Sequence, residues 1–232
     1  MPEGLIKEDI HWAVASKIPQ SRGLKSSAAV SVAAIKSLCQ ATDTELSDSE
    51  IVDLSSQAQM MANVSITGSI DDSWACLTKG WKLIDANAEE IAEGVIMEGA
   101  GLNPDDWIVI IALRDERENR PELEDFAPLY NEFEKALLAL QQGEILNCLT
   151  INGRAVCAVT NDMQGRKISN DAFINGARSS GLTGSGPAVV IVIPSLVSSS
   201  AERIKSTLSR ILPEEQIIET RFLSQDSDEL ET

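Results

Sequence analysis

The chain has 232 residues, of which 43% are hydrophobic and 24% charged, ordinary values for a globular protein. A chain of this length buries a sizeable core without a disulfide or metal staple, so bulk disorder is excluded. Its 36 acidic and 19 basic residues give a formal net charge of -17. Such a surface repels nucleic acid and anionic lipid, and the sequence has no basic patch to offset it. We therefore expect neither nucleic acid nor a membrane as a partner.

The four cysteines, Cys39, Cys76, Cys148 and Cys157, show no paired CxxC spacing, and the chain has one histidine. A zinc site is therefore not expected, and the cysteines fit small buried residues in a reducing compartment. No apolar run approaches the ~20 residues of a membrane span, and the first residues lack a signal-peptide pattern. These features predict a cytoplasmic protein.

The first part of the chain is expected to begin with a loosely alternating strand over Ile10–Ile18, which ends before Pro19. After a loop, an Ala-rich helix starts at Ser26-Ser27. A second helix runs from about Ser47, where a capping box with Glu50 is predicted, to about Ala62.

The remaining pattern alternates strands and helices and indicates an α+β or α/β class with helices segregated on a sheet. The expected strands cover 81–84, 107–113, 188–193 and 217–223, and the expected helices cover 123–140, 144–159, 169–180 and 198–211. We expect an N-terminal domain over 1–104, a C-terminal domain over 105–223 and an acidic tail over 224–232.

Residues 19–29, Pro-Gln-Ser-Arg-Gly-Leu-Lys-Ser-Ser-Ala-Ala, form the most informative segment. A glycine turn before a helix start exposes unpaired amides at the positive end of the helix, which suits an anion. Ser26 and Ser27 can donate to phosphate oxygens, and Arg22 and Lys25 add positive charge. The spacing is not that of a Walker A loop. An ordinary serine N-cap fits the same residues.

Two adjacent acids, Asp71 and Asp72, follow a glycine turn in the stretch Gly-Ser-Ile-Asp-Asp-Ser-Trp-Ala over 68–75. A carboxylate beside a phosphate site can position or accept a hydroxyl proton, and a neighbouring lysine keeps it ionised. By local sequence alone, an aspartate N-cap of the next helix is favoured.

A second glycine loop, Gly-Leu-Thr-Gly-Ser-Gly-Pro over 181–187, is expected between a helix and a buried strand. Its three glycines allow close backbone approach to a ligand and positive φ angles. A tight connector would explain one glycine but hardly three.

These three segments resemble, in order and spacing, the motifs of the galactokinase, homoserine kinase, mevalonate kinase and phosphomevalonate kinase (GHMP) superfamily. The resemblance extends from about Ile10 to Leu223. Most members carry glycine where this chain has Lys25. The Gly-Leu-Lys-Ser-Ser version and the Asp-Asp doublet look like the archaeal shikimate kinases of that superfamily.

The resemblance implies an α+β GHMP kinase fold, with a truncated ribosomal-S5-like N-terminal domain and a ferredoxin-like C-terminal domain. It implies catalytic roles for Lys25 and Asp72, with Asp71 in reserve, and Mg²⁺ ligation by Ser27. It places ATP on Pro19, Arg22, Gly23, Leu24, Lys25, Ser26, Ser27 and Ala28, and the third motif on Thr183, Gly184, Ser185 and Gly186.

The implied activity is phosphorylation of the 3-hydroxyl of shikimate by ATP, a step of chorismate and aromatic amino-acid biosynthesis. Homoserine or mevalonate kinase activity, or a catalytically inactive nucleotide-binding fragment, stays open as an alternative. The chain departs from the superfamily pattern in two ways that affect the expected activity. A Mg²⁺-ligating glutamate expected near Met61 is absent from the stretch Gln57–Ala62, and the family's first strands and first motif have no counterpart here. The oligomeric state is not predicted.

Several single residues carry weaker expectations. His11 and the four tryptophans, Trp12, Trp74, Trp81 and Trp107, fit structural roles, the tryptophans as core or domain-packing residues. Arg114 can contact an acceptor carboxylate, although an ion pair with Asp115 or Glu118 is favoured. Asn152-Gly153 is a candidate helix-interrupting turn.

Overall fold

A computed structural model describes residues 11–65, 67–116 and 121–224. These residues fall into two compact units, and the chain passes from the first to the second between Ala100 and Gly101. The short segment Ser21–Leu24 is assigned to the second unit, although the residues on both sides of it belong to the first.

The first unit contains three helices and a two-stranded antiparallel sheet. Its elements are α1 (Ser26–Ala41), α2 (Asp48–Met61), α3 (Ile70–Leu77), β1 (Trp81–Ile84) and β2 (Val95–Gly99). The predicted helices at Ser26 and Ser47 and the predicted strand over 81–84 are confirmed, whereas β2 was not expected. The capping box is present: Ser47 accepts from the amide of Glu50, whose side chain accepts from the amide of Ser47.

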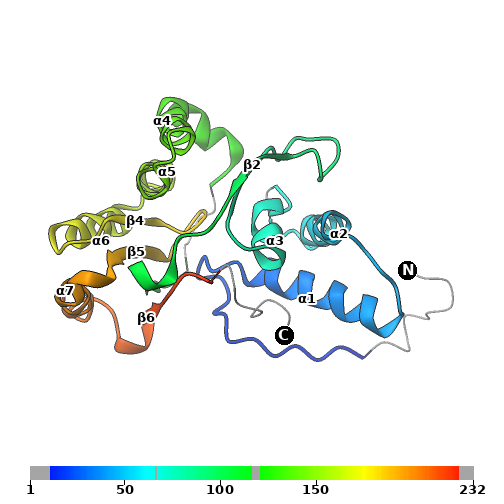
Figure 1. Ribbon diagram of the computed structural model, residues 1–232, viewed down its shortest axis with the longest axis horizontal. Coiled ribbons are helices and arrows are strands. Elements are labelled where there is room, and N and C mark those ends of the chain that lie inside the picture. The colour runs from blue at the N-terminus through cyan, green and yellow to red at the C-terminus, as the bar shows by residue number, and fades with distance from the viewer. Residues whose placement is uncertain (1–10, 66, 117–120, 225–232) are drawn as a thin grey trace. The chain divides into compact units, whose positions relative to one another are not determined.

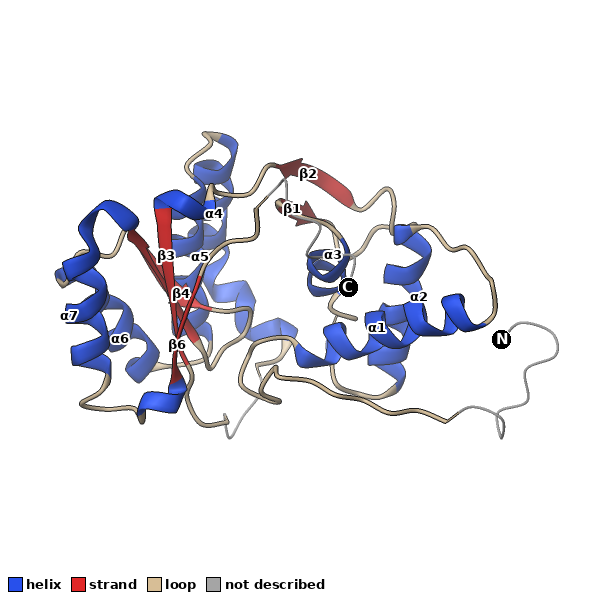
Figure 2. Cartoon of the chain, turned by 60° about the horizontal axis from the view of Figure 1, so that its bottom comes forward, coloured by secondary structure: helices blue, strands red, loops and turns tan. Residues whose placement is uncertain are grey.

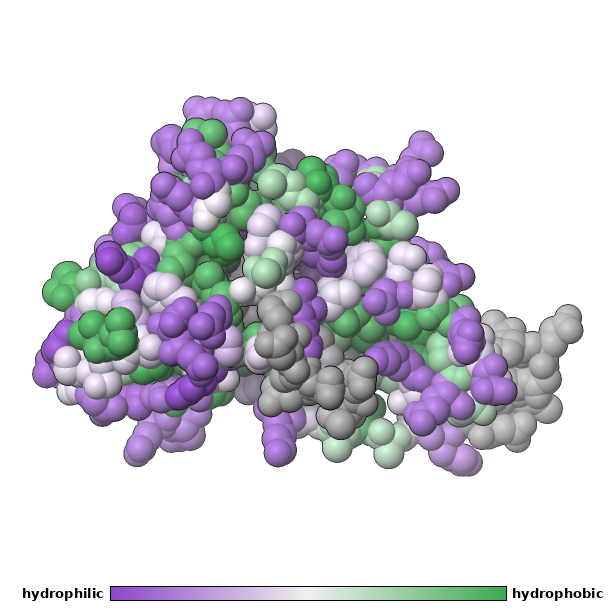
Figure 3. Space-filling view, in the orientation of Figure 1, coloured by the Kyte–Doolittle hydropathy of each residue, from purple (hydrophilic) through white to green (hydrophobic). Residues whose placement is uncertain are grey.

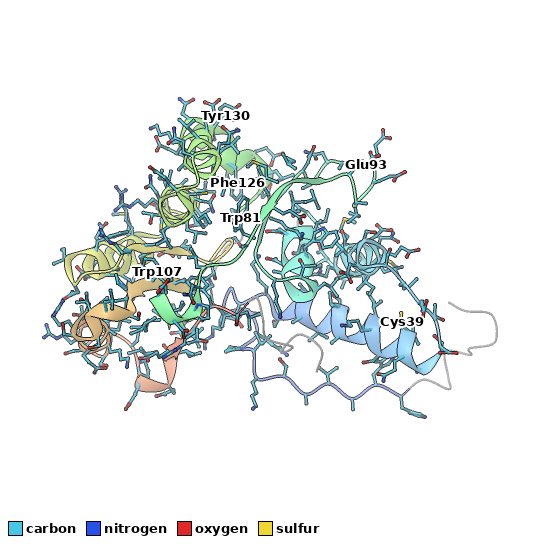
Figure 4. The ribbon with its side chains drawn as sticks, viewed as in Figure 1. Cys39, Trp81, Glu93, Trp107, Phe126 and Tyr130 are labelled. Carbon is cyan, nitrogen blue, oxygen red and sulfur yellow. The ribbon has the colours of Figure 1, made fainter. Side chains whose placement is uncertain are left out.

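A small apolar cluster holds this unit together. Val52 of α2 packs with Ile70 and Trp74 of α3, and residues of β1 and β2 close the cluster. Trp81 pairs with Gly99 across the sheet. A Cβ at Gly99 would lie 2.7 Å from the Trp81 indole, so glycine lets the ring lie over β2 (Figure 4).

The prediction of a strand over 10–18 is wrong for residues 11–18, the part that the structure describes. Residues 11–18 form no strand and are exposed. Trp12 is 55% exposed, so it is no core residue, and His11 is exposed as well. A strand needs a neighbour for its backbone groups, and the alternation of side chains alone does not supply one.

The second unit contains a four-stranded antiparallel sheet in the order β4-β5-β3-β6. The strands are β3 (Trp107–Ala112), β4 (Ser179–Leu182), β5 (Val189–Pro194) and β6 (Ile217–Thr220). Because β5 and β6 are both antiparallel to β3, which lies between them, they run parallel and are joined by the crossover helix α7 (Ser198–Leu208). This order is that of a ferredoxin-like sheet, as expected.

The helical run expected over 123–140 is divided in two. Residues Leu123–Leu129 form a 3₁₀ segment and α4 covers Tyr130–Gln141, because Pro128 lacks an amide donor and stops a continuous helix. The aromatic rings of Phe126 (Figure 4) and Phe133 still meet across the junction, with centroids 6.0 Å apart.

Helix α5 (Ile145–Val159) runs without interruption through Gly153, so the turn expected at Asn152-Gly153 is wrong. A Cβ at Gly153 would lie 2.5 Å from the Cα of Gly181, so this glycine lets α5 pack directly on β4.

The helix expected over 169–180 is wrong at both ends. Helix α6 covers Met163–Ile174, and residues from Ser179 form β4. Asp162 caps the start of α6 by accepting from the amide of Gly165. Gly176, at φ +104, follows the C-cap residue Asn175 of this helix. The glycine loop is therefore the connection of a β-hairpin rather than a link from a helix to a strand.

The core of the second unit lies between its sheet and its helices. Helices α6 and α7 lie side by side against the sheet (Figures 1 and 2). Ile110, Ile191 and Ile193 of the sheet are fully buried, and Ile168 and Ile204 of the two helices pack on them. Hydrophilic residues occupy much of the visible surface of both units, as expected for a strongly charged chain (Figure 3).

The cysteines are free thiols, of which Cys157 is buried and the other three are half-buried. Burial raises the pKa of the Cys157 thiol to about 11, with a further contribution from Asp162, so this thiol is neutral at pH 7. Among the described residues, no helix is long and apolar enough to cross a membrane.

Candidate functional site

The start of α1 presents free backbone amides. Lys25 precedes the helix in the left-handed conformation, at φ 61 and ψ 36, and the described residues supply no side-chain cap. The first helical hydrogen bond runs from the amide of Ala29 to the carbonyl of Lys25. The amides of Ser26, Ser27 and Ala28 therefore lack helical acceptors at the positive end of the helix dipole, which suits an anion such as phosphate.

Lys25 and Asp72 form an ion pair beside this helix end. The Lys25 Nζ lies 2.5 Å from the Asp72 Oδ2. Asp72 stands in the first turn of α3 and its side chain is 13% exposed, whereas Asp71 is exposed. Of the two predicted acids, Asp72 is the one that the structure places on Lys25.

Burial raises the pKa of the Asp72 carboxyl, and the neighbouring charge of Asp71 raises it further. The charge of Lys25 and hydrogen bonds from Lys25 and Ser69 act in the opposite direction without cancelling the rise. A carboxylate with a raised pKa is a stronger base than a free one, and an adjacent lysine favours its ionised form.

A buried glutamine connects the two halves of this arrangement. Gln59 of α2 is 2% exposed. Its Oε1 accepts from the Ser27 hydroxyl at 3.0 Å, and its Nε2 donates to the carbonyl of Gly68 and to the hydroxyl of Ser73. A single side chain therefore bonds both the start of α1 and the turn that carries Asp72.

More hydroxyls extend this buried network. Ser55 accepts from Gln59, and its hydroxyl lies within hydrogen-bond distance of those of Ser31 and Ser73. Because each buried polar group has partners, the network fixes the relative positions of α1, α2 and α3.

The hydroxyl of Ser27 fits the predicted role of a metal ligand in one respect. Its proton is directed to Gln59, which leaves the lone pairs of Oγ for an acceptor or metal contact. No group of three histidine, cysteine or carboxylate side chains suited to a metal occurs in the described part of the chain. A magnesium ion here would depend largely on phosphate oxygens and water, as is common for this ion.

The second unit brings the two glycine loops together. The Thr183 hydroxyl donates to the carbonyl of Gly23 at 2.6 Å, and the amide of Ala188 donates to the carbonyl of Arg22. Gly23 has φ +82, and a Cβ there would lie 2.5 Å from the carbonyl oxygen of Gly186. Only glycine fits at residue 23, both because of its φ and because of this approach.

The remaining third-motif residues lie at the tip of the β4–β5 hairpin. Gly184 and Gly186 both have positive φ, at 48 and 80. Gly184 is exposed and Ser185 is half-buried.

Arg114 does not pair as expected. Asp115 lies 3.2 Å from Arg22 instead, and Glu118 lies outside the described residues. The buried guanidinium of Arg114 pairs with Asp162, and it also donates to the carbonyl of Pro187. The guanidinium of Arg114 is thus occupied by Asp162 and Pro187, and its contact with an acceptor carboxylate stays a prediction.

Gln59 and Asp162 were not predicted as site residues. Gln59 lies four residues after Ser55 on the buried face of α2, and an uncharged polar residue on such a face was the available signal. Asp162 stands three residues before Gly165 at a helix start, which is an N-cap signal. Neither signal reveals the distant partner.

Residues 3–80 match the family described as the GHMP kinases N terminal domain. The chain is 28% identical over 191 residues to a shikimate kinase of Methanothermobacter thermautotrophicus, covering 78% of this chain and 62% of that protein. It is 27% identical over 189 residues to a shikimate kinase of Pyrococcus furiosus, covering 81% and 66%. The mevalonate kinase of Methanococcus jannaschii has a similar structure, with a TM-score of 0.58 at 20% identity over 90% of this chain and 67% of that one.

The chain thus spans less than two thirds of the length of each of these two shikimate kinases. At 20% identity, the similarity to the mevalonate kinase structure shows a similar fold and nothing about the substrate.

Proposed function

We propose that the chain is an ATP-dependent small-molecule kinase of the GHMP family, because residues 3–80 match the N-terminal domain of that family and the fold is similar to that of a mevalonate kinase. Its acceptor is a hydroxyl of shikimate, the substrate named for the archaeal relatives. The observation that carries the proposal is the Lys25–Asp72 pair beside the uncapped start of α1. An anion-binding helix start, a cation and a half-buried carboxylate next to each other are the parts that phosphoryl transfer needs.

In this proposal the amides of Ser26–Ala28 and the glycine loop over 21–24 bind the phosphates of ATP. Lys25 stabilises negative charge on the transferred group, and Asp72 orients the acceptor hydroxyl and takes its proton. The acceptor oxygen forms a bond to the γ-phosphorus while the bond from that phosphorus to the β,γ-bridging oxygen breaks. ADP leaves with the electron pair of that bond. Positioning and electrostatics supply most of the rate enhancement.

Mg²⁺ belongs to the proposal as an ion that neutralises phosphate charge when bound, with the hydroxyl of Ser27 as the ligand from this chain. Gln59 supports this role because it holds the proton of Ser27 away from the lone pairs that a cation would use. The side chain of Gln59 is neutral, and the glutamate that the superfamily pattern leads one to expect near Met61 is absent from residues 57–62.

The choice of acceptor rests on the archaeal relatives, and homoserine and mevalonate are the nearest alternatives. We would measure ADP release by the purified chain with Mg-ATP and shikimate, homoserine or mevalonate in parallel. A reaction without acceptor gives the background hydrolysis. We expect turnover with shikimate and a product heavier by one phosphoryl group.

Turnover with homoserine or mevalonate alone would contradict shikimate as the acceptor and leave phosphoryl transfer in place. Absence of turnover with every acceptor, while the chain binds ATP, would contradict the kinase and favour a nucleotide-binding protein without activity.

A further inference from the structure

Arg114 is a buried cation outside the arrangement around Lys25. It is the second residue after the end of β3 and is 6% exposed. Its Nη1 donates to the Oδ1 of Asp162 at 2.8 Å, Nη2 pairs with Oδ2, and Nε donates to the carbonyl of Pro187 at 2.7 Å. This bidentate geometry with a third bond is available to a guanidinium and not to the ammonium of a lysine.

The carboxylate of Asp162 is held in turn by the start of α6. Its Oδ1 accepts from the amide of Gly165 at 2.7 Å. A Cβ at Gly165 would lie 2.9 Å from the Arg114 Nη2, so the glycine leaves room for the ion pair. The pair is therefore anchored to two regular elements, β3 on one side and α6 on the other.

The backbone around Arg114 contacts both glycine loops. Its carbonyl accepts from the Arg22 Nη1 at 2.8 Å, while its side chain holds Pro187. Arg22 and Pro187 are next to the bonds already described between Gly23 and Thr183 and between Arg22 and Ala188. All of these residues belong to the second unit.

We propose that Arg114 and Asp162 are positioning residues, a buried ion pair that sets the spacing of the loop over 21–24 and the hairpin tip over 183–188. Neither side chain touches the reacting atoms. An effect of the pair on ATP binding rests on the proposed function, because that effect requires the two loops to hold phosphates. The effect of the pair on the loop positions does not depend on the proposed function.

The direct test is amide hydrogen exchange of Arg114→Lys and Asp162→Asn, compared with the wild-type chain. Asp162→Asn keeps an oxygen that can cap α6 and removes the negative charge of the pair. It therefore provides a folded test variant if Arg114→Lys fails to fold. We expect exchange at least about tenfold faster in peptides covering 20–25 and 183–188, with the core strands β3 and β5 unchanged. Unchanged exchange in these two peptides in a folded variant would overturn the proposal.

A matched control is Arg203→Lys, because Arg203 is an exposed arginine of α7 in the same unit that also donates to a backbone carbonyl, that of Asn175. This variant should leave both loop peptides unchanged. Faster exchange throughout the second unit in Arg114→Lys and Asp162→Asn would point to general destabilisation and would also overturn the proposal.

Kinetics give a second measurement, made at a temperature where circular dichroism shows every variant folded. We expect Arg114→Lys to raise the KM for ATP by about tenfold or more, the loss of one charge-assisted hydrogen bond, with a smaller change in kcat. An equal loss in kcat at unchanged KM would contradict positioning of the phosphate loops. If the wild-type chain shows no turnover, the proposed function fails while hydrogen exchange still decides the role of the pair.

Discussion

Lys25 combines an unfavourable backbone conformation with a charged side chain. A non-glycine residue at φ 61 costs about 1–2 kcal/mol, and Ser69, which directly precedes the helix of Asp72, also has positive φ. The superfamily pattern carries glycine at the position of Lys25, which fits this backbone requirement. The chain keeps the costly residue, and its ammonium lies on Asp72.

At the residue scale, the roles of Asp71 and Asp72 are separable by pH. Because the charge of Asp71 helps to raise the pKa of Asp72, Asp71→Asn should lower that pKa. The acid limb of kcat/KM, which requires ionised Asp72, should then move to lower pH while the plateau stays near the wild-type value. A pH–rate profile in the coupled ADP assay measures both quantities.

The same pKa has a consequence for stability. The pKa of Asp72 is higher in the folded chain than in the unfolded one. The contribution of Asp72 to the free energy of unfolding is therefore fully present below the unfolded pKa and is lost as pH rises through the folded pKa. Asp71→Asn should reduce this loss of stability.

The matched control for the pH–rate profile is Asp43→Asn, at an exposed aspartate beyond the C-terminal end of α1. This variant should leave the acid limb of kcat/KM in place. Loss of the plateau in Asp71→Asn would mean that Asp71 is the catalytic acid–base group.

At the scale of elements, the sequence predicted those whose signals are local. The capping box of α2 and the β-branched run of β3 are complete within a few residues, and both elements form where expected. Strand β4 was missed because Ser-Ser-Gly-Leu has little β-propensity, and its pairing with β5 decides its conformation. The prediction of a strand before Pro19 was wrong for the opposite reason. The local pattern is that of a strand, but the segment has no pairing partner among the described residues.

The contact between α5 and β4 yields a prediction for Gly153. Gly153→Ala places a methyl group against the backbone of Gly181 and Leu182, so the helix and strand must separate. We expect a net loss of stability, because an overpacking cost of about 1–3 kcal/mol opposes a helix-propensity gain of at most ~1 kcal/mol. Urea unfolding measures the change.

The adjacent Asn152→Ala is the control, because Asn152 is exposed on the same helix and the introduced residue is the same. It should raise stability by a few tenths of a kcal/mol through helix propensity alone. Equal stability changes in the two variants would contradict a steric role for Gly153.

At the scale of the whole molecule, the candidate site is assembled from distant parts of the chain. Glycine-rich turns, a helix start and an Asp-Asp doublet are visible in sequence because each is a short pattern. The partners that fix them are not: Gln59 is 32 residues from Ser27, and Arg114 is 73 residues from Pro187. Such contacts arise from the tertiary fold, so the sequence indicates candidate ligand-binding groups but not the residues that hold these groups in place.

The net charge of -17 also acts at this scale. It opposes the approach of an anionic nucleotide, so the few cations near the glycine loop, Arg22 and Lys25, must provide the local attraction. Both are already paired with aspartates, at 3.2 Å for Arg22 with Asp115 and 2.5 Å for Lys25 with Asp72.

The proposed role of Asp72 as the general base of phosphoryl transfer requires the negative charge of its carboxylate. We would measure turnover with shikimate and ATP affinity for Asp72→Asn beside the wild-type chain, with Asp71→Asn as the neighbouring control. We expect Asp72→Asn to lower kcat at least about 100-fold, the usual contribution of a general base, and to leave ATP affinity within a few-fold of the wild-type value. Turnover near the wild-type rate in Asp72→Asn would contradict this role of Asp72.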